Sequence, residues 1–432
     1  MAWTTLTMQV TTPLFNGGHQ PAPSESTEGG NSRSARNLDA DAGIRVSSLR
    51  GAMRYWLRAI AGAEVGNQIH VLAALESRVF GSTTRASSVA MRVPKPPPVS
   101  RNSQPDWCKR DDARWIGYLA GQGLSKPAGR GCQLTRPFVA PGTTFDLQLR
   151  LPRDDDTAAL VMAALWSLCR YGGLGARTRR GFGGLRVIAV EGHLPTPWTT
   201  ERLCAAAVVS GDGLDSDEQG RPPEIAACAP ALARIAALAR QDVGEAAPEG
   251  WADLPTYPVF GGPDIFIAGL SARTFGDWPA VLGFAGEQYR WFRATEPAPG
   301  APYHPPIKTR EWLHTVRGND RRFALGALGL PVNFKDGNIV QPEKTAAAAG
   351  GKAPLRRASP LWLRPVQDGD NGWRLLSFAF LGRFLPDGEA EVFLRGPQSK
   401  KLDVSVADVR ELSTNWITTL SRGDSFVRAA TR

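Results

Sequence analysis

The sequence predicts an α+β protein of more than one domain. Three observations support this fold class: 432 residues are too many for one ordinary domain, several short segments alternate apolar and polar residues, and longer apolar stretches have helical spacing. In residues 1–195 the expected order is strand, helix, strands, helix, strand. This is the split βαβ, or ferredoxin-like, arrangement that RNA recognition motifs also use.

The first predicted strand is 4–11, where Leu6, Met8 and Val10 alternate with polar residues. Residues 16–43 are rich in Gly, Ser, Asn and Pro and predict a long polar loop. Capping by Ser47 or Ser48 would then start a helix that runs to about residue 61, and 69–80 predicts a second helix that ends at a glycine.

Further alternation at 88–93 and within 138–151 predicts strands. Three aspartates, 154–156, precede a strongly apolar stretch, 158–171, and acidic residues at that end suit the dipole of a helix. A glycine-rich turn at 172–184 and a strand at 185–190 complete the first predicted domain, 1–195.

Residues 196–255 predict a helical linker or insertion, with Pro and Gly clusters around one Ala-rich helix at about 223–240. The second predicted domain, 256–432, has expected helices at 278–293, 308–328 and 406–420 and expected strands at 359–363 and 373–384. Residues 336–354 predict a mobile loop. It is a hypothesis that the two halves arose by duplication of one fold and then diverged.

The net charge is +10, and it is confined to one half of the chain. Residues 1–200 hold 24 basic and 14 acidic side chains, whereas the remainder holds 27 of each. A local surplus favours a polyanion-binding face in the first half. A solvated, arginine-rich surface is the alternative.

Several classes of protein are disfavoured. No run of 18 apolar residues predicts a transmembrane helix, and the first ten residues do not resemble a secretory signal. The five cysteines have no C-x-x-C pair and the five histidines no metal-binding spacing, so we expect neither a metal nor another cofactor. A reduced, cytoplasmic chain is the simplest interpretation.

Two basic motifs are candidates for binding. Arg50, Arg54 and Arg58 recur every four residues and so share one helical stripe, with no acid at i±4. Met53, Trp56, Leu57 and Ile60 would face the core. A phosphate backbone would offset the repulsion between the arginines; a solvent-facing stripe of snorkelling arginines is the alternative.

The second motif, 172–184, contains six glycines and three arginines. Glycines allow a ligand close to the backbone N–H groups, and arginines neutralise phosphates. Phe182 could stack on a base or anchor the loop. The expected RNA-binding residues of this motif are Gly173, Gly175, Arg177, Arg179, Arg180, Gly181, Phe182 and Gly183.

A third motif, Arg356-Arg357-Ala-Ser359-Pro360-Leu, stands before an expected strand in the second half. Its two arginines could hold another stretch of RNA backbone. A basic strand edge that is protected from aggregation is nearly as good an explanation.

At these residues the chain resembles the RAMP superfamily, the RNA-binding subunits of CRISPR systems. The glycine-rich loop is that superfamily's main signature. Finer features resemble the first-numbered RAMP subunit of the type III-B, or Cmr, effector complex. They are Thr12-Pro-Leu-Phe-Asn-Gly17-Gly18, the helix motif from Ser47 to Arg58, Glu76 with Phe80-Gly81-Ser82, and Arg356-Arg357-Ala-Ser359-Pro360-Leu.

The resemblance implies two fused ferredoxin-like domains with helical and loop insertions. It also implies a place near the 3′ end of the guide RNA in a complex of several subunits, with guide RNA and target RNA as partners. In such complexes, target cleavage belongs to the repeated backbone subunit, and cyclase or nuclease work to the large subunit. The second half departs from the pattern, since Gly326-Ala-Leu-Gly329 lacks the arginines of the first loop.

Three functions therefore remain open. A non-catalytic RNA-binding subunit is favoured, with no catalytic residue. A RAMP endoribonuclease would need a histidine as general acid or base, for which His19 is the one candidate, though a solvated loop histidine explains it better. A scaffold subunit without RNA contact is the third alternative.

Overall fold

The computed structural model describes residues 2–17, 43–121, 123–209, 211, 214, 216–217, 220–247, 253–262, 264–293, 311–334, 337–344, 354–369, 372–385, 390–397 and 399–427. The first half contains the strands β1 (Thr4–Val10), β2 (Ala90–Arg92), β5 (Thr144–Arg150) and β6 (Leu185–Glu191) and the helices α2 (Val46–Val65), α3 (Ile69–Phe80) and α5 (Asp155–Arg170).

The four strands of the first half form one antiparallel sheet in the order β2-β5-β1-β6. In chain order these are the second, third, first and fourth strands, so the predicted ferredoxin-like arrangement is confirmed. The alternation in β1 is confirmed as well, because Leu6, Met8 and Val10 are fully buried. Asp154 caps α5 by accepting a hydrogen bond from the Thr157 N–H at 3.1 Å.

The second half repeats part of this topology. Its central sheet has the order β7-β11-β12-β8 and is built from β7 (Val208–Val209), β8 (Phe266–Leu270), β11 (Leu361–Asp368) and β12 (Trp373–Phe380). The helices α9 (Trp278–Phe292) and α10 (Val406–Ser421) follow β8 and β12 in the chain. Thus β8, β12 and β11 match the first, third and second strands of a ferredoxin-like sheet, and the mixed α+β class is confirmed.

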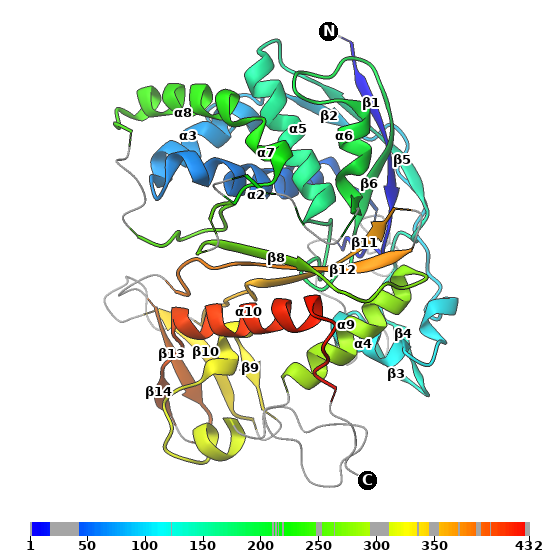
Figure 1. Cartoon of the computed structure of the whole chain (residues 1–432), viewed down its shortest axis with the longest axis vertical. Coiled ribbons are helices and arrows are strands. Elements are labelled where there is room, and N and C mark those ends of the chain that lie inside the picture. The colour runs from blue at the N-terminus through cyan, green and yellow to red at the C-terminus, as the bar shows by residue number, and fades with distance from the viewer. Residues whose placement is uncertain are drawn as a thin grey trace, which may run out of the picture.

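The central sheet is buried on both faces (Figure 1). Trp362, Val366 and Phe378 lie in one core with α2 and α5 of the first half, whereas Leu361, Leu363 and Leu375 lie in a second core with α9 and α10. The two halves therefore share a hydrophobic core.

Other elements of the described chain were not predicted. An insertion in the first half holds η1 (Asp106–Cys108), α4 (Ala113–Ala120), β3 (Ser125–Ala128) and β4 (Gly131–Leu134). A small sheet in the second half has the order β14-β13-β10-β9 and holds β9 (Val332–Asn333), β10 (Ile339–Lys344), β13 (Ala390–Arg395) and β14 (Lys400–Leu402). Most of these strands have only two to four residues, and β10 pairs with the distant β13, which leaves little local signal.

Two expectations for the second half are wrong in part. The described part of the expected helix 308–328 holds two short helical segments, η3 (Glu311–Val316, a π-helix) and η4 (Ala324–Leu328, a 3-10 helix), in place of one α-helix. Strand β10 lies inside the expected loop 336–354. One expectation for the first half is also wrong. The helix α2 begins at Val46 after Arg45, and neither Ser47 nor Ser48 caps it through its side chain.

The segment 196–255 belongs partly to each half. It contains α6 (Thr200–Cys204), η2 (Ala205–Ala207), α7 (Pro223–Ala226) and α8 (Ala229–Val243). Helix α8 packs on α3 and α5, while β7 joins the sheet of the second half beside β11. The domain boundaries at residues 195 and 255 stay a proposal.

One buried cation connects the halves. Arg364 of β11 is only 3% exposed and donates hydrogen bonds to the carbonyls of Cys169, Gly172 and Leu185, the last at 3.0 Å. The first two carbonyls lie at the C-terminal end of α5, where the helix dipole favours a cation. Burial lowers the pKa of Arg364 to about 10, so the guanidinium is still charged at neutral pH.

Substitution of this cation should destabilise the whole protein. Arg364→Met leaves three buried carbonyls without their donor, which we expect to lower the free energy of unfolding by about 3 kcal/mol or more. Urea denaturation measures the change, and the exposed Arg153→Met is the matched control. Equal stability of the two variants would contradict the role given to Arg364.

Candidate nucleic-acid interface

The glycine-rich loop, residues 172–184, is wedged between the exit of β1 and strand β11. Its N–H groups largely bond within the protein: Ala176 donates to the Phe15 carbonyl at 2.7 Å and Gly183 to the Pro13 carbonyl at 2.9 Å. A Cβ on Gly175, whose φ is +92°, would lie 2.3 Å from the Phe15 carbonyl oxygen. This glycine therefore lets two segments of the protein approach each other, rather than a ligand and the loop.

Phe182 is an anchor of the loop. It is 1% exposed and lies edge-on to Phe15, with ring centroids 5.8 Å apart. A ring so buried cannot stack on a base, so the base-stacking alternative for Phe182 is wrong. The neighbouring Gly181 and Gly183 are buried too, and Gly173 lies against the backbone of Gly183.

The three arginines of the loop diverge. The guanidinium of Arg179 lies over the Trp362 ring at 4.6 Å, on the side of α2. Arg180 lies over the Tyr289 ring at 4.1 Å and donates to its hydroxyl at 2.6 Å, on the side of α9. The guanidinium of Arg177 covers Gly121 at the end of α4. Both halves of the chain thus contact this loop.

On the side of Arg179 there is a groove of about 540 Å³. We call it, together with the small adjoining recess, the basic groove. Among its walls are the β1 exit, α2, the glycine-rich loop and β11, and Tyr55, Arg179 and Trp362 line both parts. The recess adds Arg357 and Arg383, and Arg136 lies on the opposite wall. Within the described residues no lining side chain is acidic.

The groove crowds like charges. Burial lowers the pKa of Arg357, and the neighbouring charge of Arg179 lowers it further. Burial raises the pKa of the Tyr55 phenol, against the opposing effect of Arg179. Asp253 pairs with Arg383 at 2.9 Å, whereas among the described residues that line the groove no carboxylate lies beside Arg179 and Arg357. A polyanion is therefore the ligand that these two arginines suit.

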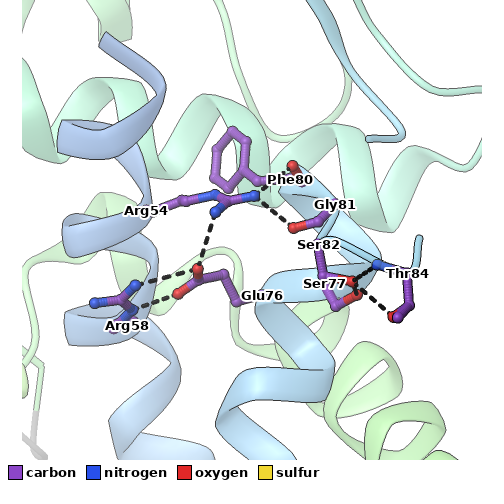
Figure 2. Close-up of polar contacts among 8 residues, drawn as sticks. All are labelled: Arg54, Arg58, Glu76, Ser77, Phe80, Gly81, Ser82 and Thr84. Atoms are coloured by element: carbon purple, nitrogen blue, oxygen red, sulfur yellow. Dashed lines mark hydrogen bonds and ion pairs between the residues drawn. The ribbon is translucent and has the colours of Figure 1, made fainter. Parts of the chain in front are cut away.

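The α2 arginines have a partner that the sequence did not reveal. Glu76 of α3 receives hydrogen bonds from Arg58, one at 3.1 Å, and lies 3.6 Å from Arg54 (Figure 2). Arg54 also donates to the carbonyls of Phe80 at 2.8 Å and Gly81 at 2.5 Å. The repulsion that seemed to require a phosphate is therefore offset by a neighbouring helix, and both side chains hold α2 to α3.

The remaining predicted residues are placed as follows. Arg50 is half-buried and lines neither part of the basic groove. Arg357 bonds its backbone to Leu330 in both directions and donates a side-chain bond to the Arg383 carbonyl at 3.1 Å. Arg356 is exposed beside it. His19 lies outside the described residues.

Sequence reasoning missed several groove residues. Tyr55 and Trp362 stand beside predicted motifs but resembled core aromatics. Arg136 stands alone in an insertion, with no motif around it. Arg45 lines neither part of the groove, but it donates to the carbonyl of the groove residue Gly17 at 2.8 Å and precedes the helix motif by only a few residues.

The described residues offer no evident catalytic chemistry. No group of three His, Cys, Asp or Glu side chains among them could hold a metal ion. The three described histidines, His70, His193 and His314, are exposed and lie outside the basic groove. In the same part of the chain, no helix is long and apolar enough to cross a membrane.

Comparisons with known proteins identify relatives of this chain. The model of the RAMP superfamily matches residues 7–186. The CRISPR system Cmr subunit Cmr1-1 of Pyrococcus furiosus is 25% identical over 345 residues, which cover 80% of this chain and 82% of that protein. Cmr1-2 of the same organism is 32% identical over 153 residues, 33% of this chain and 81% of that protein.

The fold comparison extends over nearly the whole chain. The crystal structure of Cmr1 from Pyrococcus furiosus, in its apo form, superposes with a TM-score of 0.50 and 18% identity, and covers 96% of this chain and 97% of that one. The chain therefore belongs to the RAMP superfamily, among the Cmr1 subunits of CRISPR Cmr systems.

Proposed function

We propose that this chain is a non-catalytic RNA-binding subunit of a type III-B CRISPR effector complex in the cytoplasm. It holds guide RNA near its 3′ end, target RNA, or both, in antiviral defence. The observation that carries the proposal is the basic groove, which brings Arg179 and Arg357 from the two halves together without an acidic lining residue. The naming of its relatives as Cmr subunits supports membership in such a complex.

The groove suits the phosphate backbone of RNA rather than its bases. Arginine guanidiniums bind phosphates in a bidentate manner. Tyr55 and Trp362 are largely committed to the protein, since their ring centroids lie 5.2 Å and 5.6 Å from that of Trp56. Few aromatic faces are left for bases. Binding should therefore depend mostly on phosphates, and should be strongly salt-dependent and largely independent of sequence.

The two alternatives make different predictions. A RAMP endoribonuclease needs a histidine that can reach the bound strand, and in the described part of the groove lining there is none. A scaffold subunit would show no crosslink from the groove to RNA. The acid-free groove favours the RNA-binding subunit over both.

The loop arginines should dominate RNA affinity. Replacement of Arg177, Arg179 and Arg180 by alanine should weaken binding about tenfold per lost contact. The slope of log K against log salt should fall by about two, at about 0.7 per lost single-strand phosphate. Filter binding at several salt concentrations measures both quantities. A wild-type slope in the triple variant would rule out this role for the loop.

The α2 arginines should behave differently, because Glu76 already pairs with them. The double change Arg54→Gln and Arg58→Gln should lower the melting temperature and alter the salt slope by less than about one. Comparison with the loop variant at matched RNA and salt is the control. A loss of RNA affinity as large as that of the loop triple, in a protein that is still folded, would contradict the structural role.

The purified chain should not cleave RNA. Incubation with labelled single-stranded RNA, with and without divalent metal, should leave the strand intact in a gel assay, because the described groove holds neither a histidine nor a metal-binding cluster. Cleavage that disappears in His19→Ala would overturn the non-catalytic assignment and favour the endoribonuclease.

A further inference from the structure

The insertion of the first half holds a pair of thiols that lies outside the basic groove. Cys108 ends η1 and Cys132 belongs to β4, and their sulfur atoms are 3.3 Å apart although 24 residues separate them in the chain. All five cysteines lie in the described part of the chain and are free thiols. This pair is the one whose sulfurs are in hydrogen-bonding contact.

Two glycines allow the thiols to meet. A Cβ on Gly131 would overlap the Cys108 carbonyl oxygen, and a Cβ on Gly117 of α4 would lie 2.8 Å from the Cys132 Cβ. Therefore η1, α4 and β4 all converge on the pair. A disulfide needs its sulfurs about 2.05 Å apart. The two sulfurs would have to approach by about 1 Å more, which is on the scale of a side-chain rotation.

The two thiols differ in acidity. The hydrogen bond between the sulfurs lowers the pKa of Cys132 and, together with burial, raises the pKa of Cys108. Burial raises the pKa of the remaining three cysteines, Cys169, Cys204 and Cys228. The thiolate is the reactive form of a cysteine, so Cys132 is the most readily activated cysteine of the five.

The pair lies just beneath the surface. Both thiols are 2% exposed, but Lys109, which directly follows Cys108, is exposed, and so is Arg130 in the turn between β3 and β4. These strands lie at the periphery of the molecule beside α4 (Figure 1). Local opening of η1 or of this hairpin is enough to admit a small oxidant to the sulfurs.

We propose that Cys108 and Cys132 form a reversible disulfide when the protein meets a hydroperoxide such as hydrogen peroxide. The Cys132 thiolate attacks one peroxide oxygen, the O–O bond breaks, and hydroxide leaves a Cys132 sulfenic acid. The Cys108 sulfur then attacks the Cys132 sulfur, the S–O bond breaks, and water leaves with the Cys108 proton. Hydroxide takes up the proton that Cys132 lost. The two thiols lose two electrons, and one peroxide becomes two waters.

The bond would fasten the insertion to the second half of the chain. It closes residues 108–132, which include α4, into a covalent loop. Helix α4 packs on α9, Arg110 donates to Asp277 at 2.8 Å, and the rings of Trp107 and Trp278 have centroids 5.4 Å apart. A disulfide restricts the opened state of the loop that it closes, so oxidation holds the insertion against α9. This goes beyond the proposed function and does not depend on it.

Peptide mapping of the unaltered full chain tests the bond. The reduced protein is treated with hydrogen peroxide, the remaining thiols are alkylated in denaturant, and tryptic peptides are identified by mass spectrometry. We expect a species in which the Cys108 and Cys132 peptides are joined, and the return of both thiols after dithiothreitol. Failure of this species to form, or a Cys132 sulfinic acid in its place, would overturn the inference and leave two small buried side chains.

Single variants test the order of attack. In Cys108→Ser, Cys132 has no partner, and dimedone should trap it as a sulfenic acid. In Cys132→Ser, trapping at Cys108 should be at least about tenfold weaker, because its thiol ionises less readily. The matched control is Cys204→Ser, which should still form the joined species. Equal trapping at Cys108 and Cys132 would overturn the roles given to the two thiols.

Limited proteolysis tests whether the bond fastens the insertion. Tryptic cleavage after Arg130, followed on reducing gels, should be about tenfold slower in the oxidised protein than in the reduced one, because the hairpin must open to be cut. Peroxide-treated Cys108→Ser is the control and should be cut at the reduced rate. Equal rates for the oxidised and reduced wild type would overturn the fastening of the insertion. The salt-slope measurements test RNA binding separately.

Discussion

The architecture depends on one buried cation. Arg364 extends from the central sheet of the second half and donates to carbonyls at the end of α5, at the start of the glycine-rich loop and in β6. An arginine suits this position because its planar fork reaches several acceptors at once. The contact fixes the loop relative to β11. The loop and β11 are both walls of the basic groove, so an interaction between the two halves sets their relative position.

The glycine-rich loop acts as a joint between parts of the protein. Gly175 and Gly183 adopt left-handed backbone and lie against the Phe15 and Leu174 carbonyls, where a Cβ would clash at 2.3 Å and 2.0 Å. Phe182 fills the space beneath. With most of the glycines and the phenylalanine used for packing, the arginines are the charged side chains that the loop presents. They supply charge on both sides of the loop. RNA bound by these arginines would be recognised by the positions of its phosphates rather than by the identity of its bases.

Local pattern predicted well what depends on neighbours in sequence. The alternation in β1, the apolar side of α2 and the acidic start of α5 are consequences of local periodicity and capping, and the described structure agrees with each. The pattern failed where a partner comes from a distant segment. Glu76 is 18 residues from Arg58 and one helix away, and β10 of the small sheet in the second half pairs with the distant β13, a contact that no local window contains.

The sequence by itself determined the α+β class, the ferredoxin-like order of the first half, the family and the residues that carry the positive charge. These follow from periodicity, composition and motifs, which are local properties of the chain. Only the tertiary structure decided what each charge faces. It paired Arg54 and Arg58 with Glu76, buried Phe182, and brought Arg357 to Arg179 across the two halves. It also placed Arg177 against the end of α4 and Arg180 against Tyr289 of α9. The physical reason is that the electrostatic environment of a side chain is set by distances in space, which sequence separation does not give.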